Sequence, residues 1–320
     1  MSLHIFGAIV THHGTAANNR AETEGNITTL QKLLWFGRTH TTVSAEAIRF
    51  AVRRRLAEHE ETNRYWDENG VKPMNNWNDP TFARWAAGGS YIDEDLLGFM
   101  SADAAKEETD ATAPAPEPGQ PAAAKKPKAK GTANIRRSPL EITRAISLSP
   151  YAGDVTFNAA SPGATPSAQK GDKGVKNPVP YGTELHATRY QYGFALTPAA
   201  LRKPERAAIA INALSALGEV AGNHGRFLYD FSPESVVFRV THDPAPRLLY
   251  IFEGTGPEID APALLLRAAA NDLPAHELII AGAFSRTETA RKVEALGATL
   301  VPGVRDAARL VCDRVAAGEG

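Results

Sequence analysis

The residues best suited to chemistry lie in two short runs near the start of the chain. The first run is polar and punctuated by glycine, and it contains Asn19, Arg20 and Asn26. The second contains Arg38 and then residues 44–56, in which arginine recurs. Asparagine amides and guanidinium groups donate directional hydrogen bonds, and guanidinium groups add positive charge. This combination of residue types suits the binding of phosphate groups.

Residues 44–56 are predicted to form the helix that positions these arginines. Ser44 is a favourable N-cap, and Glu46 places negative charge in the first turn. An apolar stripe recurs at every fourth position, at Ile48, Val52 and Leu56. Arg49 and Arg53 are also four residues apart, so they share another face of the same helix.

Positive charge is concentrated in this part of a nearly neutral chain. The sequence has 320 residues and a formal net charge of −1, whereas residues 20–55 hold seven Lys or Arg against three acids, a local net charge of +4. Such a patch is typical of a protein that binds phosphate-rich ligands. A helix whose arginines simply face water would carry the same charge. The asparagines and glycines of the preceding loop favour the phosphate-binding interpretation.

The spaced pattern N-R-x-E-x-x-G-N, then G-R, then V-S-x-E-A-I-R-x-A-x-R resembles the crRNA-binding backbone subunits of type I CRISPR Cascade complexes, most closely the DevR type of I-B-like systems. A second matching segment lies at residues 221–226, where glycines would let backbone amides approach an anion. The resemblance implies the following RNA-binding residues: Asn19, Arg20, Asn26, Arg38, Ser44, Glu46, Arg49, Arg53, Gly222, Asn223, His224 and Arg226.

Strand and helix signals alternate along the chain and indicate an α+β fold. Strands are predicted over residues 3–11, 151–158, 186–196, 234–241 and 248–252, and a helix over residues 204–220. After residue 255 the expected order is helix, strand, helix, strand, helix, at residues 264–270, 278–284, 287–296, 298–301 and 305–315. That last part lacks the G-x-G-x-x-G of dinucleotide-binding units, so a nucleotide-binding role is only weakly indicated.

The resemblance gives these elements an architecture. It implies a ferredoxin-like (RRM-like) palm formed by residues 1–100 and 135–255, with an inserted finger or web and a thumb-like hairpin at about residues 150–186. Residues 101–134 are dominated by Ala, Pro, Lys and Glu, which predicts a disordered linker. Residues 256–320 are expected to be a C-terminal αβ extension, to which no role is assigned.

Several acidic and aromatic residues leave alternatives open. Asp93, Glu94 and Asp95 could hold a metal or act as acid and base in a metal-dependent ribonuclease of the type III backbone kind. The resemblance instead implies a subunit that binds RNA without cleaving it. Three tryptophans lie among glycines and asparagines and could stack on bases or pin a loop to its own core: Trp66, Trp77 and Trp85.

Composition excludes some classes of protein. No apolar run approaches the roughly 18 residues of a membrane-spanning helix. The start of the chain lacks the features of a signal peptide. A single cysteine, Cys312, excludes an internal disulfide and suits a reducing cytoplasm. No cysteine cluster suits zinc, and neither a metal nor a cofactor is expected.

The resemblance also implies a function and a set of partners. The expected protein is a non-catalytic subunit that oligomerises along a crRNA, binds its phosphate backbone and presents the spacer for pairing with target DNA in antiviral defence. Expected partners are the crRNA, target DNA, copies of the chain itself and other Cascade subunits. Those subunits are a small backbone-capping subunit, a large subunit and a crRNA-processing endonuclease, with a helicase-nuclease as an indirect partner.

Overall fold

A computed structural model describes most of the chain. The described residues are 2–17, 23–69, 74–101, 134–159, 180–220, 228–254, 256 and 258–319. Nearly all of the expected linker lies outside them. So do the following candidate RNA-binding residues: Asn19, Arg20, Gly222, Asn223, His224 and Arg226.

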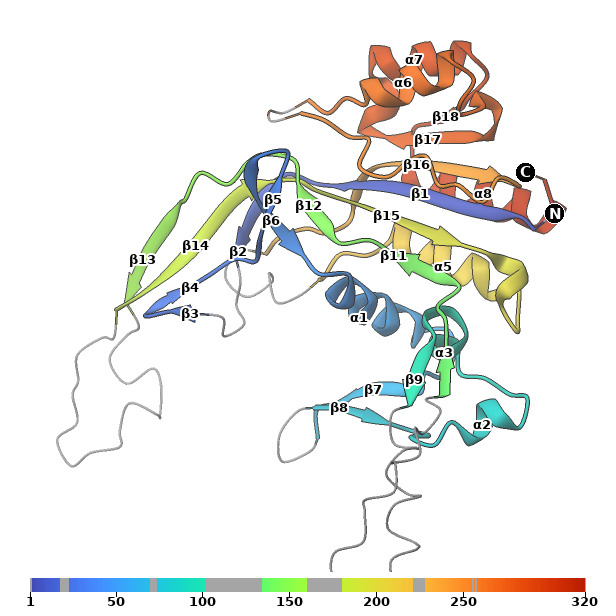
Figure 1. Ribbon diagram of the computed structural model, residues 1–320, viewed down its shortest axis with the longest axis horizontal. Coiled ribbons are helices and arrows are strands. Elements are labelled where there is room, and N and C mark those ends of the chain that lie inside the picture. The colour runs from blue at the N-terminus through green and yellow to red at the C-terminus, as the bar shows by residue number, and fades with distance from the viewer. Residues whose placement is uncertain are drawn as a thin grey trace, which may run out of the picture.

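A nine-stranded sheet forms the centre of the molecule (Figure 1). Its strands follow the order β18-β17-β16-β1-β15-β12-β6-β5, and β11 also pairs with β15. Neighbouring strands are antiparallel except β17 and β18, which are parallel. Their bounds are β1 (His4–Thr11), β5 (Lys32–Trp35), β6 (Arg38–Val43), β11 (Leu140–Ile142), β12 (Ala145–Ser147), β15 (Tyr190–Leu196), β16 (Pro233–Thr241), β17 (Leu278–Gly282) and β18 (Thr299–Val301).

The central strand β1 divides the interior into two cores. In its register, Ile5 pairs with Leu196 of β15 and with Val240 of β16. Successive side chains of a strand point to opposite faces. Ile5 and Ile9 therefore contribute to one core, whereas Phe6, Ala8 and Val10 contribute to the other.

Helices cover both faces of the sheet. The core that contains Ile5 also contains side chains of α1 (Ala45–Leu56), α5 (Arg206–Ser215) and α8 (Val304–Ala317). The other core contains side chains of α6 (Pro262–Ala269) and α7 (Glu288–Ala295). Figure 1 shows α6 and α7 on one side of the sheet and α1 and α5 on the other. None of the helices in the described parts of the chain has the length and apolarity to span a bilayer.

Helix α1 forms as its sequence predicts. The hydroxyl oxygen of Ser44 accepts a hydrogen bond from the amide of Ala47 at 3.2 Å, which satisfies an otherwise unpaired first-turn donor. The predicted stripe of Ile48, Val52 and Leu56 is buried in the core. The buried stripe leaves Arg49 and Arg53 on a flank of the helix, where partners from other elements reach them.

A smaller five-stranded sheet, here called the blade, projects from the large sheet (Figure 1). Strands β13 and β14 pair antiparallel within the range in which the thumb-like hairpin is predicted, about residues 150–186, and residues 160–179 between them lie outside the described residues. The blade consists of β2 (Gly14–Ala17), β3 (Thr23–Glu24), β4 (Ile27–Thr28), β13 (Val155–Ala159) and β14 (Pro180–Thr188).

An insertion module follows α1 and packs beneath it. It consists of β7 (Arg64–Asp67), β8 (Met74–Trp77), α2 (Ala83–Ala86), α3 (Ile92–Leu97), β9 (Phe99–Ser101) and β10 (Asn134–Arg136). Strands β7 and β8 form one antiparallel hairpin, and β9 pairs with β10. Figure 1 shows the blade to the left of α1 and the β7–β8 hairpin below α1.

The C-terminal part confirms the predicted alternation of helix and strand. Its strand β17 pairs with β16, so the part extends the central sheet. Three 3-10 helices complete the list: η3 (Pro198–Ala200), η4 (Ala275–Glu277) and η5 (Ala283–Arg286).

Several predicted elements differ from the structure. The strand predicted over residues 186–196 falls on two strands, since β14 ends at Thr188 and β15 begins at Tyr190. The predicted helix over residues 204–220 is shorter, since α5 ends at Ser215. The strand predicted over residues 248–252 is wrong. Arg247 and Tyr250 adopt positive φ angles of 53° and 56°, which interrupt an extended strand, although Leu248 and Ile251 are buried.

Candidate nucleic-acid interface

The described candidate residues lie on three elements. Ser44 caps α1, and Glu46, Arg49 and Arg53 belong to it. Arg38 is exposed at the start of β6, and Asn26 is exposed in the turn between β3 and β4. In Figure 1, β4 lies on the blade and β6 lies above α1. The candidate residues on these elements and on α1 are therefore spread over an extended region of the molecule.

Glu46 acts within the helix. A hydrogen bond from its own backbone amide lowers the pKa of the Glu46 carboxyl, and Ser44, Arg144 and Arg49 lower the pKa further. A carboxylate in the first turn also interacts favourably with the helix dipole. Ser44 and Glu46 therefore fix where α1 begins, and they act on a ligand only through the helix.

Arg49 ties α1 to the insertion module. Its Nη2 donates to the carbonyl of Leu97, at the end of α3, and its Nη1 donates to the hydroxyl of Ser138 at 3.2 Å. Both terminal nitrogens are thus used inside the protein. The side chain of Arg49 holds three chain segments together.

Arg53 is bound differently. Its Nε donates to the carboxylate of Asp93 at 3.0 Å, and Asp93 also accepts the backbone amides of Asn63 and Arg64 at 2.7 and 3.1 Å. Burial lowers the pKa of the Arg53 guanidinium, a change that Asp93 opposes and the nearby charge of Arg64 reinforces. The ion pair with Asp93 engages Nε, and Arg53 also lines a surface cavity.

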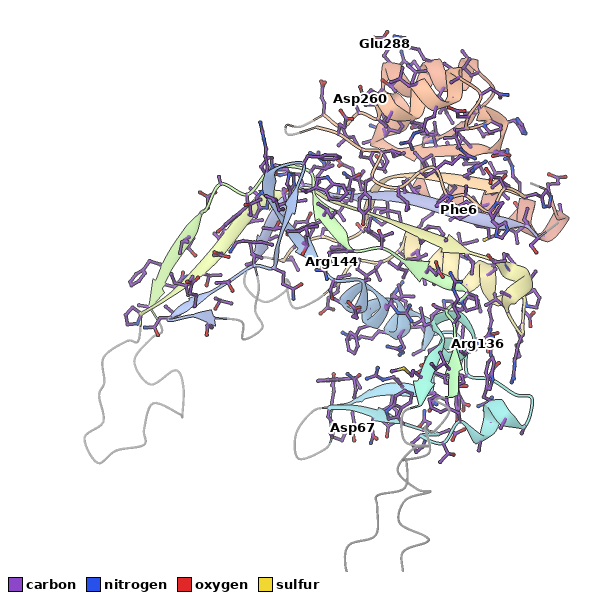
Figure 2. The ribbon with its side chains drawn as sticks, viewed as in Figure 1. Phe6, Asp67, Arg136, Arg144, Asp260 and Glu288 are labelled. Atoms are coloured by element: carbon purple, nitrogen blue, oxygen red, sulfur yellow. The ribbon has the colours of Figure 1, made fainter. Side chains whose placement is uncertain are left out.

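The acidic run of α3 holds the fold together. Asp95 is fully buried and pairs with Arg136 at 2.8 Å and with Arg206 at 3.0 Å. It also accepts the backbone amides of Arg202 and Lys203 at 2.9 and 3.1 Å. Figure 2 shows Arg136 beside α3.

The neighbouring residue Glu94 is also buried and hydrogen-bonded within the protein. Glu94 accepts from the side-chain amide of Asn63 at 2.7 Å, and burial raises the pKa of its carboxyl. Asp93, Glu94 and Asp95 thus face protein donors. Within the described ranges no group of three His, Cys, Asp or Glu residues is arranged to hold a metal ion.

The three tryptophans of the insertion module divide into two kinds. Trp77 packs edge-on against Phe82, and the ring of Trp85 packs against Phe99 and beneath two guanidinium groups, those of Arg136 and Arg202. These two rings pin their loops to the protein. Trp66 is 39% exposed and touches Phe50 of α1 edge-on at 6.2 Å between centroids.

Sequence reasoning left out several residues that belong beside Arg53. Phe50, Arg54 and Arg64 line the same cavity as Arg53 and Trp66. The sequence does contain a signal for two of them, because Phe50 and Arg54 are four residues apart on α1 and so share one face of the helix. The position of Arg64 depends on the pairing of β7 with β8, which no local pattern indicates.

Known proteins of similar sequence belong to one family. The family model described as "CRISPR-associated negative auto-regulator DevR/Csa2" matches residues 8–213. A protein of Myxococcus xanthus (strain DK1622), described as "CRISPR-associated protein Cas7/Cst2/DevR", is 56% identical over 321 residues, which cover 98% of this chain and 98% of that protein.

Two solved structures share the fold. A chain of a "CRISPR RNA-guided surveillance complex" superposes with a TM-score of 0.55 at 13% identity, over 98% of this chain and 99% of that one. A chain of a "CRISPR RNA-guided surveillance complex, pre-nicking" also gives a TM-score of 0.55, at 11% identity, over 97% of this chain and 99% of that one. Since the family model matches residues 8–213, more than half of the chain, and the Myxococcus relative is 56% identical over 98% of both chains, the chain belongs to the DevR/Csa2 family of CRISPR-associated proteins.

Proposed function

We propose that this protein is a backbone subunit of a CRISPR ribonucleoprotein and binds the phosphate backbone of a crRNA. The observation that carries the proposal is that α1 lies beside the blade and above the β7–β8 hairpin (Figure 1) and carries Arg53, held by Asp93, and the exposed Arg54. An exposed or oriented guanidinium on such a helix can neutralise phosphates without reading sequence. Membership of the DevR/Csa2 family and the likeness to surveillance-complex chains support it.

The core of the subunit is proposed to be a ferredoxin-like, RRM-like palm. In chain order its elements are β1, α1, β12, β15, α5 and β16. In the sheet the four strands follow the order β16-β1-β15-β12, and all their pairings are antiparallel. A β-α-β-β-α-β unit with this order supports the assignment. The blade is then the counterpart of the thumb.

Assembly is proposed to be head to tail along the guide. Heterologous contacts between identical subunits generate an open helical filament, which suits a linear strand. Target DNA would pair with the held spacer, so sequence recognition would rest with the guide. The other Cascade subunits named above are proposed as neighbours in the same complex.

The subunit is proposed to be non-catalytic. The carboxylates that a ribonuclease would need, Asp93 and Asp95, accept hydrogen bonds from arginines and backbone amides. A carboxylate bound in this way is a poor ligand for a metal and a poor base. This commitment of both groups favours binding over cleavage.

The proposal predicts that the protein captures RNA of uniform length. The full chain is expressed with the other proteins of a CRISPR complex and a repeat–spacer transcript, then purified, and its RNA is sized on a denaturing gel. We expect one length class with wild-type protein, because each subunit covers a fixed stretch of strand. The matched control is a transcript of equal length without repeats.

Two results would contradict the proposal. Purified protein that carries no RNA, or RNA of every length with both transcripts, would remove the binding claim. Incubating the purified subunit alone with labelled RNA and magnesium tests the second claim, since we expect the RNA to remain intact. Metal-dependent cleavage that EDTA abolishes would show that the subunit is an enzyme.

A further inference from the structure

A cavity of about 310 Å³ lies between the outer face of α1 and the β7–β8 hairpin. One wall is formed by Phe50, Arg53 and Arg54, which fall within about one turn of the helix. The facing wall is formed by Arg64 and Trp66 of β7. In Figure 2, Asp67 marks the end of β7 beneath α1. The volume is at the small end of the range for ligand pockets, which suits one nucleotide-sized group.

The cavity has an aromatic wall with an accessible face. Trp66 is 39% exposed although it touches Phe50, whereas Trp77 and Trp85 are half-buried and packed against other rings of the module. Trp66 and Asn75 are cross-strand partners, so the tryptophan ring and a side-chain amide lie next to each other in the lining. A ring of this kind offers a stacking surface, and an amide offers both a donor and an acceptor to a base edge.

The cavity also has an excess of positive charge. Arginines supply three lining residues, Arg53, Arg54 and Arg64, whereas Glu68 is the acid among the residues that line it. Arg54 is 58% exposed and meets Glu219 only at 3.9 Å, at the margin of an ion pair.

Arg64 has unused hydrogen-bonding capacity as well. Its guanidinium lies over the ring of Trp77, with Cζ 4.9 Å from the ring centroid. The Nε atom of Arg64 is buried and has no hydrogen-bond partner. An unpaired buried donor carries a desolvation cost, so Arg64 is a lining residue whose hydrogen bonds are incomplete in the protein alone.

We propose that this cavity binds one nucleotide of a single strand, with its base stacked on Trp66 and its phosphate at Arg54 and Arg64. The inference rests on the proposed function and adds Arg54, Arg64 and Trp66 to a surface of which the candidate residues included only Arg53. Basic grooves that carry an exposed aromatic ring are how proteins hold single strands without reading their sequence. A protein partner is less well matched, because the surface it would have to cover is basic even though Asp93 pairs with Arg53, since Arg54 and Arg64 also line it against Glu68.

The first test removes the stacking surface. Full-length Trp66→Ala and Trp66→Phe proteins are compared with wild type for binding of fluorescent single-stranded RNA and DNA of equal sequence. Loss of one stacked base should weaken binding about 5- to 150-fold in the alanine variant, and phenylalanine should restore most of it. The matched control is Met74→Ala, because Met74 is exposed on the same hairpin but does not line the cavity.

The second test removes one phosphate contact. Arg54→Ala should make the slope of log affinity against log salt shallower by about 0.7, the contribution of one contact on a single strand. Arg55→Ala is the matched control, because Arg55 is the next residue of α1, pairs with Glu58 and does not line this cavity. Photocrosslinking of a 4-thiouridine oligonucleotide should yield a peptide that contains Tyr65 and Trp66.

The outcomes separate this inference from the proposed function. If wild-type protein binds no single strand, the proposed function fails and this inference fails with it. If wild type binds but Trp66→Ala and Arg54→Ala bind equally well with the wild-type salt slope, only the cavity assignment fails. A Trp66→Ala protein that binds normally but no longer assembles would identify a contact between copies and overturn the assignment. A loss confined to RNA or to DNA would identify the strand that supplies the nucleotide.

Discussion

Replacing Asp95 by alanine is expected to lower the free energy of unfolding by about 3–5 kcal/mol, the range for removing one partner of a buried ion pair. Asp95 is fully buried and neutralises Arg206, whose side chain is itself 1% exposed. In this variant Arg206 would keep Glu60 as its other partner. The hydrogen bond from Arg206 lowers the pKa of the Glu60 carboxyl, so Glu60 stays charged beside it. The amides of Arg202 and Lys203 would be left without an acceptor.

Urea denaturation followed by circular dichroism measures this loss. The matched control is Glu141→Ala, which removes an exposed ion pair with Arg137 and should change stability by less than about 1 kcal/mol. An Asp95→Ala protein with nearly wild-type stability would mean that Glu60 alone compensates the buried arginine. The stability of this variant also decides whether it can test Asp95 as a catalytic residue. If Asp95→Ala protein is unfolded, its failure to cleave RNA would not show that Asp95 takes part in cleavage.

The double variant Arg49→Ala/Arg53→Ala is expected to lose both stability and RNA affinity. The sequence alone predicts that both arginines contact phosphates, that the salt slope becomes shallower by about 1.4, and that stability hardly changes. The structure supplies a reason to expect destabilisation of about 2–4 kcal/mol. Arg53 pairs with Asp93, whose side chain is 3% exposed, and Arg49 bridges Leu97 and Ser138.

Single variants divide the two effects. Arg53→Ala should make the salt slope shallower by about 0.7, because Arg53 lines the cavity, whereas Arg49→Ala should leave the slope unchanged because both its terminal nitrogens are used inside the protein. Affinity is measured by fluorescence anisotropy at five salt concentrations, with circular dichroism at each to verify that the protein is folded. Equal changes of slope in the two single variants would mean that Arg49 leaves its internal partners to reach RNA.

Local signals were sufficient for much of the fold. Helix α1 was predicted because its cap and its apolar stripe are encoded within thirteen consecutive residues, 44–56. The C-terminal alternation was predicted for the same reason. The strand predicted at residues 248–252 is wrong because a run of apolar residues indicates burial but not the backbone conformation. Leu248 and Phe252 are buried, but they lie in a loop that is not paired as a strand.

Signals for the site were only partly local. Arg49 and Arg53 were found from their spacing, but their partners Asp93, Leu97 and Ser138 lie 40 to 89 residues away along the chain. No periodicity carries that information. The choice between stacking and pinning for Trp66 also depended on tertiary neighbours, since all three tryptophans occur in similar sequence surroundings.

The pairing of β9 with β10 creates a site at which additional residues can be inserted into the chain. Ser101 and Asn134 are cross-strand partners, so the chain leaves the insertion module and returns to it at adjacent points. Arg136 then enters the fixed network of Asp95 directly. Because closing a longer loop costs only about 0.6 kcal/mol for each doubling of its length, a fluorescent or affinity domain placed between these two residues should leave the core undisturbed. The same geometry would let relatives differ widely in the length of this segment while keeping one scaffold.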